Sequence, residues 1–187
     1  MTHIKNTFDE ISKNFIILSD NCCEDISNAV ELILLSLKND GKIMFCGNGG
    51  SASDSQHLSS ELIGKYQMKR KPIPSIALTT DTSAITAISN DFSFNDIFSR
   101  QVEALGNEGD VLYASSTSGK SENILNAIKK ARELKMKIIG LTGINDINMR
   151  NICDITINAP SNRTDRIQEM HIAIGHIICE LVEKQLC

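Results

Sequence analysis

The chain has 187 residues, of which 41% are hydrophobic and 22% charged, and its formal net charge is −4. This length suits one globular domain that buries about two thirds of its unfolded surface. The acidic balance, the aromatic content of 4% and the absence of tryptophan argue against a nucleic-acid partner, which would need a basic face or a base-stacking platform.

The sequence also argues against a membrane protein. Its apolar runs are far shorter than the ~20 residues that span a bilayer, and residues 1–6 lack the apolar core of a signal peptide. The six cysteines form no C-x-x-C pair and lie mostly within apolar patterns, which is typical of thiols in a reducing compartment rather than of zinc ligands or disulfides. We therefore expect a cytoplasmic protein.

The N-terminal region is predicted to form two amphipathic helices that join near residues 20–23. Apolar residues recur there at spacings of three and four in two runs, which are Ile4, Phe8, Ile11, Phe15 and Leu18, then Ile26, Val30, Ile33 and Leu37. Such narrow stripes suit a helix pair that packs on another surface, and a partner subunit is one possibility.

Strands are predicted to alternate with helices in the rest of the chain. Short apolar runs predict strands over residues 42–46, 75–79, 111–114, 137–142 and 154–158. Helical spacing predicts helices over residues 54–66, 84–89, 94–105, 124–134 and from 164 onward. This alternation indicates one α/β domain with a parallel sheet covered by helices on both faces. Ligands of such sheets bind beyond the carboxyl ends of the strands.

The loop Gly47–Ser53 lies at one of those ends. It places three glycines in four positions between a strand and a helix, and Ser51 and Ser53 add hydroxyl groups. Backbone N–H groups and the positive end of the helix dipole make this a site for a polar or anionic ligand. The nucleotide motifs do not fit, because Ala52 replaces the last glycine of G-x-G-x-x-G and the P-loop lysine is missing. The alternative is that Ser51 only caps the helix, with Asp54 closing a capping box.

A second candidate loop, Ser115–Ser121, follows the third strand and has four hydroxyl residues in a row before a glycine. Hydroxyl groups and free N–H groups at a helix start suit a phosphate monoester without any metal. The alternative is a serine-rich turn in which Ser121 caps the next helix. Lys120 either adds charge to the loop or points to solvent.

Three polar residues on helices are candidates for chemistry. His57 and Glu61 are four residues apart and share a helix face near the first loop. A pair of this kind is usually a solvated ion pair, but its place beside the loop makes acid–base or metal chemistry an alternative. His176 lies on the largely apolar closing helix, where a buried polar group is costly unless it has a partner. We expect His176 to belong to a site and His171 to be structural, whereas Asp165 and Gln168 alternatively form a capping box.

Together these motifs resemble the sugar isomerase (SIS) domain family. The resemblance rests on CGNGGSASDSQH from Cys46, NDFSFNDIFSRQVEALG from Asn90, STSGKS from Ser116 and DRIQEMHIAIGH from Asp165. Within this family the chain most specifically resembles the phosphoheptose isomerases, and the resemblance covers nearly the whole chain. It implies a single SIS domain over residues 1–187, with a flavodoxin-like five-stranded parallel sheet and an N-terminal helical pair. It also implies a homotetramer with active sites between subunits.

The resemblance further implies an activity and a site. Phosphoheptose isomerases convert sedoheptulose 7-phosphate to D-glycero-D-manno-heptose 7-phosphate, which supplies bacterial surface heptose. Glu61 would be the base and His176 its acid–base partner. The phosphate would bind Ser116, Thr117, Ser118 and Ser121. The sugar would contact Asn48, Gly49, Gly50, Ser51, Glu61, Asn90, Asp91, Asp165 and Gln168. Zinc, where present, would be held by His57, Glu61, Gln168 and His176.

Two other functions share the same fold. One is a non-enzymatic SIS protein, either a partner of the replication initiator or a sugar-phosphate sensor, which would need the phosphate loop but not the Glu61 and His176 pair. The other is an isomerase of a different sugar phosphate. Incubation with sedoheptulose 7-phosphate, followed by a search for aldoheptose phosphate, separates a phosphoheptose isomerase from both of these.

Overall fold

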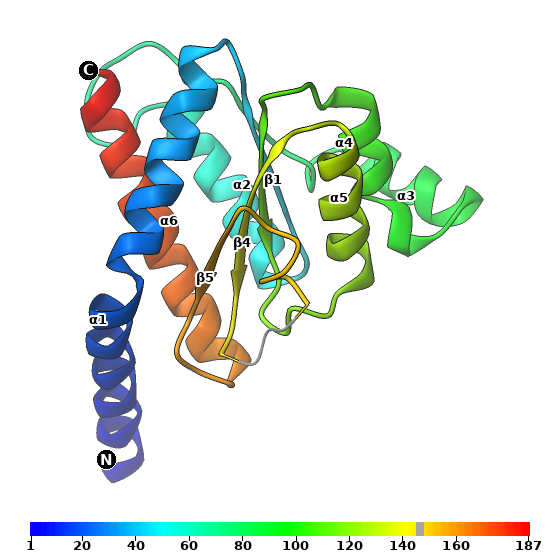
Figure 1. The fold of residues 1–187 in the computed structure, drawn as a ribbon. Helices are drawn as coiled ribbons and strands as arrows, with labels where there is room; N and C mark the ends of the chain where they lie inside the picture. Colours follow the sequence, from blue (N-terminus) through cyan, green and yellow to red (C-terminus); the bar gives the residue numbers. More distant parts are fainter. Residues whose placement is uncertain (145–147) are drawn as a thin grey trace.

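A five-stranded parallel sheet forms the centre of the molecule (Figure 1). The computed structural model describes residues 1–144 and 148–187. The strands are β1 (Ile43–Gly47), β2 (Ser75–Ala77), β3 (Val111–Ser115), β4 (Lys137–Thr142) and β5 (Ile155–Asn158). Their order, β2-β1-β3-β4-β5, is the flavodoxin-like order, so the predicted fold class is confirmed.

Helices cover both faces of this sheet. They are α1 (Thr2–Lys38), α2 (Gly50–Ile63), α3 (Thr82–Asp91), the 3₁₀ helix η1 (Phe94–Asp96), α4 (Ser99–Leu105), α5 (Glu122–Glu133) and α6 (Thr164–Leu186). Side chains of a strand alternate between faces: Ile43 and Phe45 of β1 join the core under α1, α2 and α6. Met44 and Cys46 join the core under α4 and α5.

The predicted N-terminal helical pair is wrong, because α1 is one continuous helix of 37 residues. Residues 20–23 were the expected join, but they contain neither glycine nor proline, the residues that usually break a helix. Cys22 also continues the buried stripe from Leu18 to Ile26, so the helix keeps its face on the core through this point. Asp20 and Asn21 are exposed on the other side.

Two helix boundaries also differ from the prediction. The expected helix over residues 94–105 is divided into η1 and α4, because Ser93 caps a separate first turn by accepting a hydrogen bond from the Asn95 N–H. Helix α2 begins at Gly50, four residues before the predicted start, and Gly49 is its N-cap residue. Across residues 1–144 and 148–187, we find no helix of the length and apolar character that a membrane span requires.

Candidate active site

The two candidate loops lie side by side at the carboxyl edge of the sheet. Gly47, the last residue of β1, is in register with Ser115, the last residue of β3. Asn48 and Asn123 then join the loops through two reciprocal amide hydrogen bonds of 2.9 Å. Asn123 is only 2% exposed, so this amide pair is a fixed part of the edge.

The first loop requires its glycines for two reasons. Gly49 has a positive φ of 55°, which side chains of L-residues rarely tolerate. A Cβ at Gly50 would lie 2.4 Å from Nε2 of Gln168, so the start of α2 touches the polar residue predicted on α6. The capping-box alternative is wrong, because the N-cap is Gly49 and Ser51 lies buried inside the first turn.

The second loop gathers hydroxyl groups. Ser116 and Ser121 approach each other with 3.1 Å between their Oγ atoms, and Ser118 Oγ accepts a hydrogen bond from the Lys120 N–H. Ser121 is the N-cap residue of α5, but its hydroxyl faces Ser116 instead of capping the helix. Lys120 and Thr117 line a small cavity beside the loop. The loop is therefore a compact set of donors at the start of a helix.

A cluster of ionisable side chains forms where α2 meets α6. The Nε2 atom of His57 lies 2.9 Å from Nε2 of His176 and 3.5 Å from Oε1 of Glu61. The side chains of His57 and Glu61 are 48% and 22% exposed, so the cluster can be reached from solvent. We call His57, Glu61 and His176 the acid–base cluster.

Close helix packing explains how this cluster forms. A Cβ at Gly175 would lie 2.5 Å from Cδ1 of Leu58, so α2 can approach α6 this closely only because residue 175 is glycine. Leu58 and Gly175 are the chain neighbours of His57 and His176. The glycine therefore brings the two imidazoles within hydrogen-bond distance.

Two further residues border the cluster. Asp54 lies about one turn before His57 on α2. Burial raises the pKa of Asp54 above its usual range, although the nearby His57 and His176 counteract part of this rise. The ring of Tyr66 lies 5.8 Å from the ring of His176, between centroids. Burial is the main cause that raises the pKa of Tyr66, and nearby acidic groups raise it further.

His171 has a structural role, as predicted. Its ring is buried, and Nε2 lies 3.1 Å from the carbonyl oxygen of Thr142 at the end of β4. Burial lowers the pKa of His171 to about 4, so the ring is neutral at neutral pH. It connects α6 to the sheet about one turn and a half before His176.

Other predicted site residues lie farther away in the single chain. Asn90 and Asp91 are exposed at the end of α3, where the Asn90 amide donates to the Asp91 carboxylate at 2.7 Å. Figure 1 shows α3 projecting from the side of the sheet opposite to α6. Asp165 lies in the first turn of α6, where its hydrogen bond from Arg163 lowers its pKa. The N-cap of α6 is Arg163, so the alternative in which Asp165 and Gln168 form a capping box is wrong.

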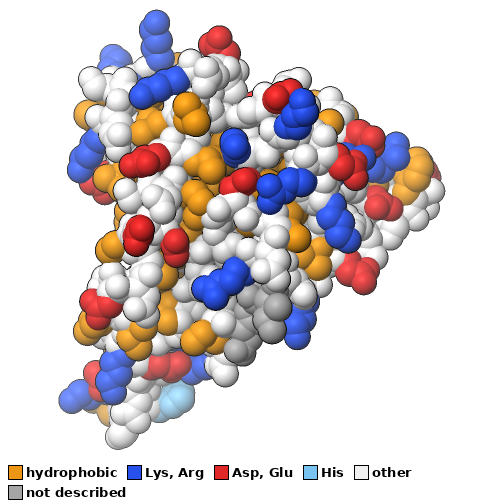
Figure 2. All heavy atoms as spheres, viewed as in Figure 1, with side chains coloured by type: hydrophobic (Ala, Val, Ile, Leu, Met, Phe, Trp, Pro, Cys, Tyr) orange, Lys and Arg blue, Asp and Glu red, His pale blue; other side chains and the backbone are white. Residues whose placement is uncertain are grey.

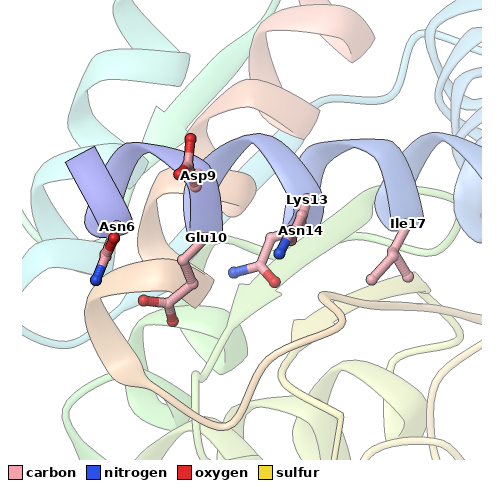
Figure 3. A pocket seen from close by; sticks show the side chains of 6 residues that line it. All are labelled: Asn6, Asp9, Glu10, Lys13, Asn14 and Ile17. Atoms are coloured by element: carbon pink, nitrogen blue, oxygen red, sulfur yellow. The ribbon is translucent and has the colours of Figure 1, made fainter.

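A separate hollow lies on the N-terminal half of α1 (Figure 3). It is lined by Asn6, Asp9, Glu10, Lys13, Asn14 and Ile17. All six side chains come from one helix, and Figure 3 shows Asp9 pointing away from the others. Glu10 forms an ion pair of 2.8 Å with Arg163, so the hollow adjoins α6 but does not include the acid–base cluster.

Sequence reasoning missed Asn123 and Tyr66. Asn123 is polar and directly precedes the helix predicted over residues 124–134, which is an ordinary position for a solvated residue. Tyr66 was predicted as the last residue of the helix over residues 54–66, but α2 ends at Ile63, and helical spacing could not assign Tyr66 a partner on α6. Both contacts join segments that are far apart in the sequence.

Comparison with known proteins places this arrangement in a family. A family profile described as "SIS domain" matches residues 8–143. The phosphoheptose isomerase of Rhodospirillum rubrum is 54% identical over 173 residues, which are 92% of each chain. The chain belongs to the phosphoheptose isomerase family of SIS domains.

Solved structures agree with this assignment to the SIS domain family. The phosphoheptose isomerase of Neisseria gonorrhoeae superposes with a TM-score of 0.93 at 42% identity, covering 98% of both chains. The phosphoheptose isomerase of Francisella tularensis superposes with a TM-score of 0.94 at 38% identity, covering 98% of this chain and 97% of that one. Both likenesses extend over α1 and α6 as well as the sheet.

Proposed function

We propose that this SIS-domain protein is an aldose–ketose isomerase that converts sedoheptulose 7-phosphate to D-glycero-D-manno-heptose 7-phosphate for bacterial surface heptose. The observation that carries the proposal is the acid–base cluster, in which His57 Nε2 lies 2.9 Å from His176 and 3.5 Å from Glu61. A protein that only senses a sugar phosphate would need the second loop, Ser115–Ser121, which we call the hydroxyl loop, but not this cluster.

The spacing of the two loops and the cluster suits a long sugar phosphate. The phosphate would bind Ser116, Thr117, Ser118 and Ser121, whose hydroxyl groups lie at the start of α5. His57 lies about two turns, or roughly 10 Å, along α2 from Gly50. A substrate with its phosphate at one end and its reacting carbons at the other would extend from loop to cluster.

The sugar chain would lie between these ends. Asn48, Gly49, Gly50 and Ser51 would contact it through the first loop, and Gln168 would contact it from α6, where its side chain touches Gly50. Asn90, Asp91 and Asp165 are also proposed to contact the sugar. Because Asn90 and Asp91 lie on the outlying α3, a site that includes them would need α3 of a neighbouring subunit.

Glu61 would act as the base. Its carboxylate takes a proton from C1 of the ketose, and the electrons of that C–H bond form the C1–C2 double bond of an enediol. The same proton, or its replacement, is then returned to C2, which leaves an aldehyde at C1. His176 would move the hydroxyl proton from the C1 oxygen to the C2 oxygen, because an imidazole can donate and accept near neutral pH.

Zinc is proposed as a possible ion of this site. The donors suit it in kind, since His57, His176 and Glu61 offer two imidazoles and a carboxylate, but Gln168 lies against Gly50. Within the described part of the chain, no group of three or more His, Cys, Asp or Glu side chains is arranged to hold a metal. When bound, zinc would stabilise negative charge that develops on the substrate.

We also propose a cytoplasmic homotetramer. Residues 2–17 of α1 are all at least partly exposed, and Figure 1 shows this half of the helix extending beyond the sheet. Figure 2 shows hydrophobic side chains among the charged ones along this edge. The exposed ones on α1 include Ile4, Phe8, Ile16, Ile17 and Leu35. Burying them against other subunits would remove apolar surface from water.

An apolar groove between α1 and α6 supports the same assembly. Its apolar lining residues are Phe15, Leu18, Cys23, Ile26, Ala173, Ile177 and Leu181. Light scattering should give a homotetramer, whereas a fully active monomer of 20.6 kDa would contradict the proposed assembly.

The activity is tested directly with purified protein and sedoheptulose 7-phosphate. We expect an aldoheptose phosphate to form, detected by chromatography or by solvent deuterium incorporated at C2. The same incubation with Glu61→Gln serves as the blank. A wild-type protein that binds the substrate without converting it would support a sensor instead of an isomerase.

A further inference from the structure

The segment that follows α2 is fastened to the end of α6 by a buried ion pair. Arg70 donates from Nε to Oε1 of Glu183 at 2.8 Å. The two side chains are only 4% and 1% exposed, although Arg70 belongs to a basic stretch and Glu183 lies near the C-terminus. Figure 1 shows the connection between α2 and β2 passing over this end of α6.

Glu183 is bound by backbone as well as by Arg70. Its Oε1 accepts from the Tyr66 N–H at 3.0 Å, and its Oε2 accepts from Gln67 at 2.7 Å and Met68 at 2.8 Å. Burial alone would raise the pKa of Glu183, but these three N–H donors and Arg70 together lower it. The carboxylate is therefore a charged anchor for the whole 66–68 segment.

Arg70 uses its remaining donors on the end of α2. Its Nη2 donates to the carbonyl oxygen of Glu61 at 2.8 Å, and its Nη1 donates to that of Leu62 at 2.8 Å. The last carbonyl groups of a helix lack partners within the helix and carry its negative dipole end. A guanidinium is well matched to this end, because its planar fork can satisfy a carboxylate and two carbonyl groups at once.

The two helices joined in this way are those that carry the acid–base cluster. Arg70 binds the carbonyl of Glu61 itself, and Glu183 lies about two turns beyond His176 on α6. Tyr66 adds a direct link, because its N–H binds Glu183 while its ring contacts the His176 ring. A change at the ion pair would therefore be felt at both sides of the cluster.

We propose that Arg70 and Glu183 are positioning residues for the isomerisation, which set the separation of Glu61 and His57 from His176. Within the cluster, Arg70 binds only the backbone carbonyl of Glu61, and Glu183 binds Arg70 and the 66–68 backbone, so both act through other groups and neither is a catalytic residue. This inference rests on the proposed function for its kinetic consequence. Small displacements matter because a shift of about 1 Å between reacting groups can cost roughly a hundredfold in rate.

The main test compares Arg70→Ala with a matched control, Lys42→Ala. Lys42 forms an ion pair with the buried Asp110 where β1 and β3 begin, so its loss should lower stability without altering catalysis. For Arg70→Ala we expect kcat to fall by about tenfold to a hundredfold with KM within about threefold of wild type. Far-UV circular dichroism at the assay temperature confirms that each variant is folded.

Chemical rescue separates positioning from simple destabilisation. Guanidinium at roughly 20 mM, far below denaturing concentrations, should restore part of the activity of Arg70→Ala and leave Lys42→Ala unchanged. Glu183→Gln provides a second variant in case Arg70→Ala does not fold. It keeps the shape but sets an amide N–H against backbone donors, so kcat should fall without any rescue. Folded variants of both residues with kcat within twofold of wild type would overturn the proposal.

NMR of the histidine rings tests the positioning role without any substrate. The chain has four histidines, so their ring resonances can be followed individually by NMR. Arg70→Ala should shift those of His57 and His176, whereas His3 and the buried His171 should stay unchanged. If the wild-type protein does not isomerise sedoheptulose 7-phosphate, the proposed function fails, and these resonances still decide the positioning role. Unshifted His57 and His176 resonances would refute it.

Discussion

The hydroxyl loop and the acid–base cluster are built in different ways. The hydroxyl loop is one short segment whose groups contact each other, as Ser116 and Ser121 do at 3.1 Å. The cluster exists only because α2 and α6 pack closely where Leu58 meets Gly175. A local segment can hold a phosphate even if the helices shift, whereas the cluster depends on their separation. Binding and chemistry should therefore respond to different substitutions.

Glu61→Gln should have the largest effect and should alter chemistry alone. The amide keeps the size and hydrogen-bonding shape of the carboxylate but cannot accept the carbon-bound proton. We expect kcat to fall by about 10²–10⁴, while substrate binding measured by calorimetry persists because the hydroxyl loop is intact. Repeating the assay with chelator and with added zinc separates loss of a base from loss of a metal ligand.

The control for Glu61→Gln is Glu103→Gln, whose carboxylate pairs with Lys130 on the opposite face of the sheet. It should leave kcat unchanged. Activity of Glu61→Gln within about threefold of wild type would mean that another group removes the proton, and the role of α2 would have to be reassigned.

The structural role of His171 can be tested through the pH dependence of the free energy of unfolding. Because the folded-state pKa is about 4 and the unfolded value is about 6.5, only the unfolded chain binds this proton between these values. The free energy of unfolding should therefore be full above pH ~6.5 and decrease as pH falls toward ~4, by up to about 3 kcal/mol. Denaturant titrations at several pH values measure this.

The variant His171→Gln isolates that contribution. It should flatten the pH dependence of stability between pH ~4 and ~6.5 relative to wild type, whereas His3→Gln, at an exposed position of α1, should not. An unchanged slope in His171→Gln would show that other groups cause the acid sensitivity.

Ser121→Ala should alter binding and spare chemistry. It removes one hydrogen bond to a charged phosphate, which contributes about 1.5–3 kcal/mol, so KM should rise by roughly tenfold to a hundredfold with little change in kcat. Ser118→Ala should behave in the same way. Ser36→Ala is the matched control, because the Ser36 hydroxyl is buried and donates to the carbonyl of Gly109 at the other edge of the sheet. Unchanged KM and unchanged inhibition by simple sugar phosphates would refute the phosphate assignment.

Much of this organisation could be predicted from local patterns. The strands could be predicted because their apolar runs are short and bounded by turn residues, and the two loops because carboxyl ends of parallel strands share one edge. The break in α1 was predicted wrongly, since polar residues at 20–21 of a helix can simply face solvent. The start of α2 was predicted too late, because Gly50 is a poor helix former, yet the close approach of Gln168 leaves no room for a side chain at this position.

The remaining features depend on distant partners that no local pattern reveals. Arg70 resembles a surface residue between two lysines, yet it is buried because Glu183 lies opposite. Asn123 likewise resembles an ordinary helix residue, but its amide is hydrogen-bonded to Asn48. Periodicity records which face of an element is apolar, but it does not record which buried polar groups meet each other.

Substitution of Asn123 should have the smallest effect on activity, but it is the sharpest test of whether binding and chemistry are separate. The Asn123 amide joins α5 to Asn48 of the first loop through two hydrogen bonds. Asn123→Asp keeps the acceptor but replaces the donor, so an oxygen would face the Asn48 Oδ1. Loss of this buried hydrogen bond should loosen the first loop, and we expect kcat/KM to fall by roughly fivefold to tenfold.

Unlike the other variants, Asn123→Asp should change KM and kcat together, because the loop that it supports borders both regions. Asn126→Asp is the matched control, since Asn126 lies on the same helix but donates to the carbonyl of Asn95. If Asn123→Asp changes KM alone, the amide pair belongs only to the phosphate end. If kcat alone falls, Asn48 acts near the reacting carbons, and the two regions are not joined through this pair.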